Sequence, residues 1–138
     1  MPVSRRRLKA ATRIDTDPER QLPTGTEPVH GTEYDFRTAR EIGGLEIDYA
    51  FTDLERDPDG RAWVRLACPD GRAVEAWSDQ AYPVIEIYTA DALAPPRRRR
   101  GLAVEPMSAP PNALATGEMI VRLEPHDEHV ATWGVRLR

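Results

Sequence analysis

The sequence predicts an all-β protein, built as an antiparallel β-sandwich. Apolar and polar residues alternate with a period of two in several short runs, which is the spacing of half-buried strands. Thirteen prolines in 138 residues, nearly twice the usual share of about 5%, favour short elements joined by stiff turns. No stretch keeps the apolar spacing of a long amphipathic helix. We therefore expect about seven strands and no long helix.

The first 40 residues are expected to contribute little regular structure. Residues 1–10 are basic and are expected to be disordered. A weakly alternating run over 11–16 predicts the first strand, which Asp17-Pro18 ends. Prolines and glycines punctuate residues 19–40 too often for strands, so this stretch is expected to be a long loop. Such a loop either borders a binding cleft or wraps the surface.

The middle of the chain predicts a three-stranded antiparallel meander from Leu45 to Trp77. In its first strand the apolar side chains at every second position share one face, and Asp48 lies on the other. The turn signals Asp57-Pro58-Asp59-Gly60 and Pro69-Asp70-Gly71 then bracket the second strand. Because both have the composition of hairpin turns, the three strands are expected to pair in order.

The strand that follows Pro83 is apolar on both faces and is therefore expected to be central in its sheet. The run Arg97–Arg100 comes next, and it is either a solvated connection or a nucleic-acid contact. The last two strands are expected over residues 119–123 and 130–137, separated by a turn at residues 124–127.

Glu105 is the first candidate for chemistry. Leu102 and Val104 alternate with polar or small residues, and Pro106 removes a backbone donor where the strand would continue. Glu105 is therefore expected at a strand end, beside a rigid loop that carries Asn112. A carboxylate in this place is either a solvated strand-end residue or part of a site.

Composition excludes several classes of function. A net charge of −4 gives no general attraction to nucleic acid or to an anionic membrane. No apolar run reaches the length of a transmembrane span, so we expect a soluble, cytoplasmic protein. The single Cys68 supports neither an internal disulfide nor a zinc site.

Several motifs together resemble the galactose mutarotase (aldose 1-epimerase) family. The most specific is V-E-P-M-S-A-P-P-N-A at residues 104–113, which contains Glu105. G-G-L-E-I-D-Y-A-F-T-D-L at residues 43–54 and Y-P-V-I-E-I-Y-T-A-D at residues 82–91 match in the same order. L-P-T-G-T-E-P-V, Y-D-F-R and T-W-G-V extend the resemblance to residues 22–29, 34–37 and 132–135.

This resemblance implies a mutarotase-like supersandwich fold and an isomerase that acts on glucose-type or galactose-type hexoses without a metal or cofactor. Glu105 matches the family's general base, and Asp48 matches the residue that binds sugar hydroxyls. Asn112, Trp77 and Tyr88 are the further candidates for substrate binding. Packing in a core or an interface is the alternative for Trp77.

The resemblance covers only the C-terminal half of a family member, so residues 1–138 are interpreted as one partial domain. The family's acid histidine belongs to the other half, and His30, His126 and His129 do not match it. The chain is therefore expected to be a truncated reading frame or part of a split protein, and the expected partner is a homodimer mate or a separate N-terminal half.

Two further alternatives stay open. The chain could be a non-catalytic carbohydrate-binding module or an interaction module, and Asp48 with Glu105 could form the carboxylate pair of a glycosidase. Ala90 replaces the glycine usual in the family's Tyr-Thr-Gly-Asp pattern, which would require a negative φ at this position.

Overall fold

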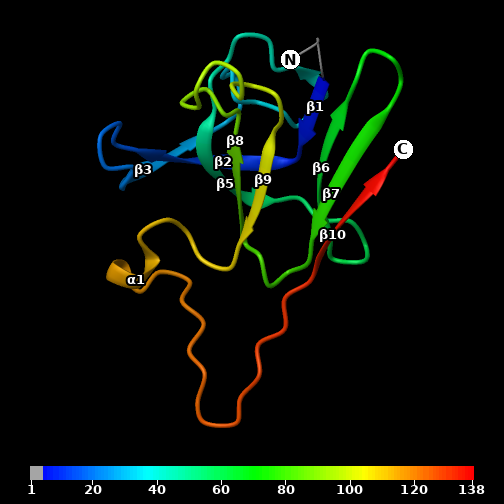
Figure 1. Cartoon of the computed structure of the whole chain (residues 1–138). Coiled ribbons are helices and arrows are strands. Elements are labelled where there is room, and N and C mark those ends of the chain that lie inside the picture. Colours follow the sequence, from blue (N-terminus) through cyan, green and yellow to red (C-terminus); the bar gives the residue numbers. More distant parts are fainter. Residues whose placement is uncertain (1–4) are drawn as a thin grey trace.

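The computed structural model describes residues 5–138, and these form two antiparallel β-sheets of five strands each and one short helix. The sheets pack face to face as a sandwich, which confirms the predicted fold class (Figure 1). The β6 sheet has the order β10 (Trp133–Leu137), β7 (Ala73–Ser78), β6 (Ala62–Ala67), β1 (Arg5–Leu8) and β4 (Arg40–Glu41). The β5 sheet has the order β3 (Pro23–Pro28), β2 (Ala10–Thr16), β5 (Asp48–Leu54), β8 (Val84–Tyr88) and β9 (Ala103–Met107). The helix α1 spans Ala113–Thr116.

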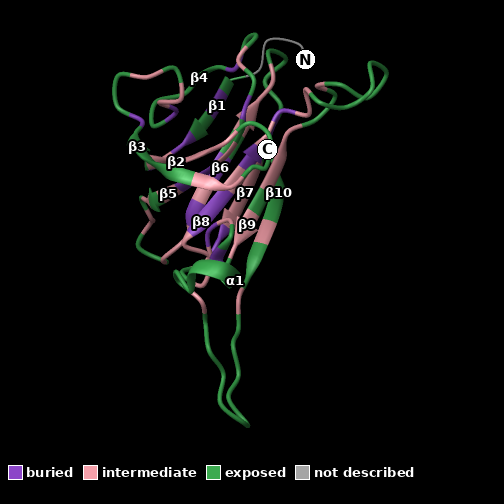
Figure 2. Cartoon of the chain, turned by 90° about the vertical axis from the view of Figure 1, so that its left-hand side faces the viewer, coloured by how far each residue is buried: buried purple, intermediate pink, exposed green. Residues whose placement is uncertain are grey.

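The main core lies between the two sheets, as the alternating strands require. Phe51, Ile85 and Ile87 of the β5 sheet meet Leu8 and Val64 of the β6 sheet, and all five are at most 3% exposed. Full burial of each such side chain stabilises the fold by about 1.5–3 kcal/mol. Figure 2 shows that buried residues are concentrated on the strands of the sandwich. The expectation that β8 is central is confirmed, because it pairs with β5 on one side and β9 on the other.

A second, smaller apolar cluster lies on the opposite face of the β5 sheet. Ile14, Ala50 and Val84 are buried there, and Met107 packs against them. Ile14 and Ala50 are direct cross-strand partners, so both belong to this face. The outer face of the β5 sheet is therefore partly desolvated, and this raises the pKa of carboxyl groups that lie beside the cluster.

One charged side chain is enclosed in the main core. Arg6 on β1 is 0% exposed, and its guanidinium carbon lies 3.9 Å from the centre of the Phe36 ring. Within the described part of the chain, none of its three side-chain nitrogens has a hydrogen-bond partner. Burial lowers the pKa of Arg6 to about 9.

The prediction that residues 1–10 are disordered is wrong for residues 5–10. Arg5–Leu8 pair with β6 and β4, and Leu8 is 2% exposed. Burial of every second side chain orders this segment despite its basic composition. Residues 1–4 of that prediction lie outside the described residues. The long loop predicted over 19–40 is also interrupted, because residues 23–28 form the edge strand β3 beside β2.

The predicted three-stranded meander is wrong. β6 and β7 form the expected hairpin around Pro69-Asp70-Gly71, but β5 pairs with β2 and β8 and lies in the other sheet. The segment after β5 crosses between the sheets instead of forming a hairpin. Arg56 holds this crossing in place, because its guanidinium donates to the carbonyls of Gly60, Ser78, Asp79 and Tyr82.

The turn after β8 corrects the expectation for Ala90. This residue has φ of 61°, in the left-handed region that costs a non-glycine residue roughly 1–2 kcal/mol. The turn is fixed by Thr89, whose buried hydroxyl accepts a hydrogen bond from the Ile47 amide at 2.9 Å. Arg99 also clamps it, with contacts to Asp91 and to the carbonyls of Gly43 and Leu45. Within the run Arg97–Arg100 it is thus a packed residue, while the other three arginines are exposed.

The strand predicted over residues 119–123 is not formed. Residues 118–131, called the arm here, leave the sandwich after α1 and return to β10 as an exposed excursion (Figures 1 and 2). A turn at its tip is closed by a hydrogen bond from the Asp127 amide to the Glu124 carbonyl. No helix among the described residues is long and apolar enough to cross a membrane.

Candidate functional site

Three carboxylates from three neighbouring strands lie on the outer face of the β5 sheet. Asp48 begins β5, Glu86 is in the middle of β8, and Glu105 is in the middle of β9. Glu86 and Glu105 are direct cross-strand partners, while Asp48 pairs with Tyr88, two residues beyond Glu86. Direct partners have Cβ atoms roughly 4.5–5.5 Å apart and diagonal neighbours roughly 7–8 Å apart. The three side chains are called the carboxylate row below.

The middle carboxyl of the row is held in its neutral form. Burial raises the pKa of Glu86 to about 8, and the nearby charges of Asp48 and Glu105 add to this effect. Burial also raises the pKa of Asp48 above its ordinary value. A carboxyl with a pKa near 8 retains its proton through most of the neutral range. The row therefore carries a proton donor between two groups that accept hydrogen bonds.

The position of Glu105 differs from its predicted place at a strand end. β9 continues through Pro106 to Met107, so Glu105 lies inside the strand and is exposed. Pro106 is tolerated because β9 is an edge strand, in which a missing backbone donor on the outer side breaks no ladder bond.

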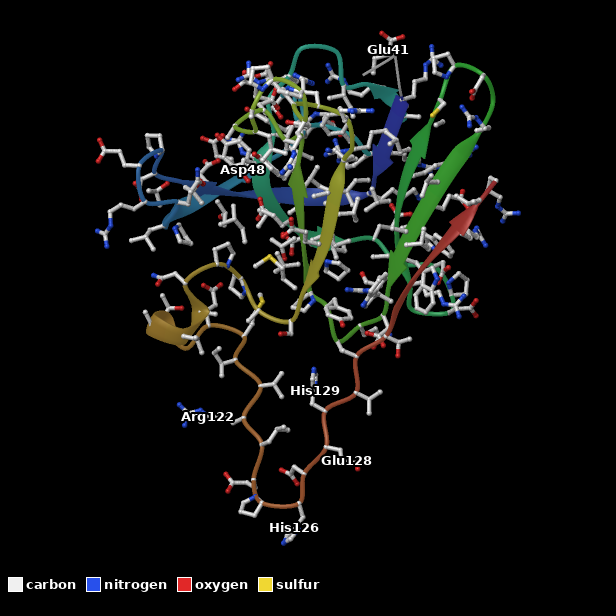
Figure 3. All side chains as sticks on the ribbon, in the orientation of Figure 1. Glu41, Asp48, Arg122, His126, Glu128 and His129 are labelled. Carbon is white, nitrogen blue, oxygen red and sulfur yellow. The ribbon has the colours of Figure 1, made fainter. Side chains whose placement is uncertain are left out.

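Asp48 and Tyr88 meet at one end of the row. They line a depression of about 260 Å³ together with residues of three nearby segments, among them Gln21, Glu46 and Asp91. Figure 3 shows Asp48 at the start of β5, in the body of the sandwich. Asp48, Tyr88 and Glu105 of the predicted site are thus on one face, with Glu86 among them.

Asn112 belongs to a different hollow. It is exposed, has φ of 64°, and immediately precedes α1, without a side-chain cap to that helix. The hollow also contains Pro106 and Met107 at the end of β9. Asn112 therefore lies beyond the end of the strand that carries Glu105, and it does not share the depression of Asp48 and Tyr88.

Trp77 lies apart from the other predicted site residues. It lies in β7 of the β6 sheet, whereas the carboxylate row belongs to the β5 sheet. The Arg61 guanidinium stacks at 4.2 Å on its ring, and the ring also covers Gly134 of β10. Trp77 therefore packs within its own sheet, the alternative left open by the sequence.

His30, His126 and His129 are all exposed. His30 is near Arg37, and Figure 3 places His126 and His129 on the arm, well away from Asp48. Within residues 5–138, no three or more histidine, cysteine, aspartate or glutamate side chains are arranged so that they could hold one metal ion, and this includes the carboxylate row.

Glu86 is the residue that sequence reasoning missed. Its signal was present, because an acidic residue in a strand with apolar residues on both faces is unusual. The apolar residues on both faces predict a central strand, and Glu86 is the one charged side chain in it. The raised pKa of Glu86 depends in part on the charges of Asp48 and Glu105, which belong to strands distant in sequence.

The fold of this chain is similar to that of a known class of proteins. The crystal structure of the GalM/aldose epimerase homologue from C. elegans superposes on 75% of this chain with a TM-score of 0.63 and 19% identity. The chain thus has an aldose epimerase-like β-sandwich fold. In sequence, this chain is 31% identical to the uncharacterized protein YihR of Escherichia coli K12. The matched segment is 113 residues long and covers 80% of this chain. No protein-family model matches the chain.

Both relatives are much longer than this chain. It spans 33% of the length of YihR and 36% of that of the C. elegans protein. The likeness to the C. elegans structure, at 19% identity, shows the fold alone. The activity and substrates of a whole aldose epimerase come to this chain only as a proposal.

Proposed function

We propose that the carboxylate row binds a hexose and takes part in interconverting its two anomers, as in an aldose 1-epimerase. Glu105 is the general base, and Asp48 binds sugar hydroxyls with Tyr88 beside it. The observation that carries this proposal is the common face of Asp48 and Glu105, which are 57 positions apart in sequence. Those are the two residues that the sequence motifs select.

The chemistry requires proton transfer and no redox step. A base takes the proton of the anomeric hydroxyl while an acid protonates the ring oxygen, and the ring opens to an aldehyde. Rotation about the C1–C2 bond and closure by the reverse transfers give the other anomer. Charge-assisted hydrogen bonds from sugar hydroxyls to Asp48 would hold the ring in place during this sequence.

Polarimetry on fresh α-D-glucose and α-D-galactose tests the proposal. We expect the chain to accelerate the approach to anomeric equilibrium, and Glu105→Gln to reduce that acceleration by about a hundredfold or more, the usual size of a general-base contribution. Glu128→Gln is the matched control, because Glu128 lies on the arm and is exposed (Figure 3).

Two results would contradict the catalytic proposal in different ways. Hexose binding by calorimetry without any acceleration would indicate a non-catalytic carbohydrate-binding module. The absence of both binding and acceleration would remove hexoses from the function of this chain.

A second candidate function, that of an interaction module, is favoured by one specific observation. The inner faces of β7 and β10 carry large apolar side chains that the opposite sheet leaves open: Val74 is 39% exposed, Val135 55%, Trp133 58% and Leu137 81%. Both β10 and β9 are edge strands of their sheets. A partner polypeptide, either a second copy or a separate N-terminal half, would cover this surface.

A further inference from the structure

The proposed reaction needs a proton donor placed directly beside the base. The anomeric hydroxyl oxygen and the ring oxygen are bonded to the same carbon atom, so the base and the acid must reach two oxygens that lie close together. Two side chains that are direct cross-strand partners satisfy this requirement, because their Cβ atoms are roughly 5 Å apart.

Glu86 is the group that stands in this position. It is the direct partner of Glu105, and antiparallel partners project to the same face of a sheet. The half-buried Glu86 is bordered on this face by the apolar cluster of Ile14, Ala50 and Val84, with Ala50 its direct partner on β5. Glu105 on the edge strand is exposed. Two carboxyl groups of the same chemistry thus occupy different environments side by side.

We propose that Glu86 is the proton donor of the mutarotation reaction and that Glu105 is its proton acceptor, an inference that rests on the proposed function. In the opening step the Glu86 carboxyl gives its proton to the ring oxygen, and the Glu105 carboxylate takes the proton of the anomeric hydroxyl. The bond between C1 and the ring oxygen breaks as the C1 carbonyl forms. Closure on the other face returns both protons, so each carboxyl regains its initial state.

The surroundings of Glu86 favour this assignment. Asp48 from β5 and Glu105 from β9 face it with negative charge, and the phenol of Tyr88 shares its face on β8. No cation of the described residues contributes to its ionisation, and burial is the largest cause of the raised pKa. Neighbouring carboxyl groups whose environments separate their pKa values are a general way to obtain an acid and a base from the same residue type.

The pH dependence of catalysis tests the assignment. We expect the acceleration of mutarotation to fall on the alkaline side as Glu86 ionises, with an apparent pKa near 8 that belongs to the coupled row. Glu86→Gln keeps the shape of the side chain but has no acidic proton. It should lower kcat by about a hundredfold, leave KM nearly unchanged and abolish the alkaline limb.

A carbon-13 NMR titration of the glutamate carboxyls provides a readout that does not depend on activity. In the wild-type chain one glutamate should titrate near pH 8, and its signal should be missing from Glu86→Gln. In Glu105→Gln the same carboxyl should titrate at lower pH, because one neighbouring charge is removed. Thermal unfolding shows whether each variant is folded. Glu128→Gln is the control for replacing a glutamate outside the row.

The outcomes separate this inference from the proposed function. If the wild-type chain gives no acceleration over buffer, the proposed function fails and the donor role of Glu86 fails with it. If the wild-type chain is active but Glu86→Gln keeps its rate and its alkaline limb, only the assignment of Glu86 is overturned. Titration of every glutamate in the ordinary range would also overturn it.

Discussion

Arg6 is the clearest conflict between a single residue and its surroundings. Its guanidinium is enclosed in the core against Phe36, without a hydrogen-bond partner in the described structure. A buried charge that lacks a partner costs folding free energy, and only part of this cost is offset by stacking on an aromatic ring. Replacing it with an apolar side chain of similar length should therefore stabilise the protein.

We predict that Arg6→Met raises the free energy of unfolding by about 1–3 kcal/mol, within the range seen when buried charges are replaced by apolar residues. Urea denaturation followed by circular dichroism measures this change. Arg5→Met is the matched control, because Arg5 is the preceding residue of the same strand and is exposed. It should change stability by less than about 0.5 kcal/mol. A loss of stability in Arg6→Met would mean that the guanidinium has a partner.

At the scale of elements, the arm shows that an alternating pattern does not by itself form a strand. Met119, Val121 and Leu123 alternate with other residues, yet they are 50%, 46% and 53% exposed. Among the described residues no strand pairs with this segment, so its backbone groups face solvent instead of a ladder. A strand needs a partner in space as well as a pattern in sequence.

Hydrogen exchange should distinguish the arm from the sheets. We predict that most amides of residues 118–131 exchange within about tenfold of the rate of an unstructured peptide, because their openings cost almost no free energy. The amide of Asp127 is the internal control, since it donates to the Glu124 carbonyl. Amides of β5 and β8 should be protected more than roughly a thousandfold, because their exchange requires global unfolding. Strand-like protection of residues 119–123 would contradict the structure.

For the whole molecule, the main consequence of the fold is that the sandwich is open along one side. The inner face of β10 carries Leu137, Val135 and Trp133, and its free edge lacks a neighbouring strand within residues 5–138. Exposed apolar faces beside free strand edges favour association with another chain. If the chain is an interaction module, its partner could be a second copy that pairs along β10. This case can be tested with the purified chain alone.

We predict that sedimentation equilibrium detects self-association of the chain and that Leu137→Lys weakens it about tenfold to a hundredfold, which corresponds to the apolar burial of one leucine. Leu114→Lys is the matched control. Leu114 is 96% exposed on α1, away from the open face, so the same change of charge should leave association unaltered. A wild-type chain that remains monomeric at high concentration would contradict pairing through β10.

Local patterns in the sequence determined much of the architecture. Alternation predicted strands and their buried faces, the apolar run after Pro83 predicted a central strand, and Pro69-Asp70-Gly71 predicted the β6–β7 hairpin. The motifs selected Asp48 and Glu105. These features are predictable because strand periodicity and turn chemistry depend on neighbours along the chain.

Only the tertiary structure decided which strands are neighbours. It placed β5 and β6 in different sheets, separated Trp77 from the carboxylate row, and put Glu86 beside Glu105. It also decided the raised pKa of Glu86, since that depends on burial and on two charges from other strands. Pairing, burial and electrostatic coupling are properties of residues that are distant in sequence and close in space, and the period of a strand contains no information about them.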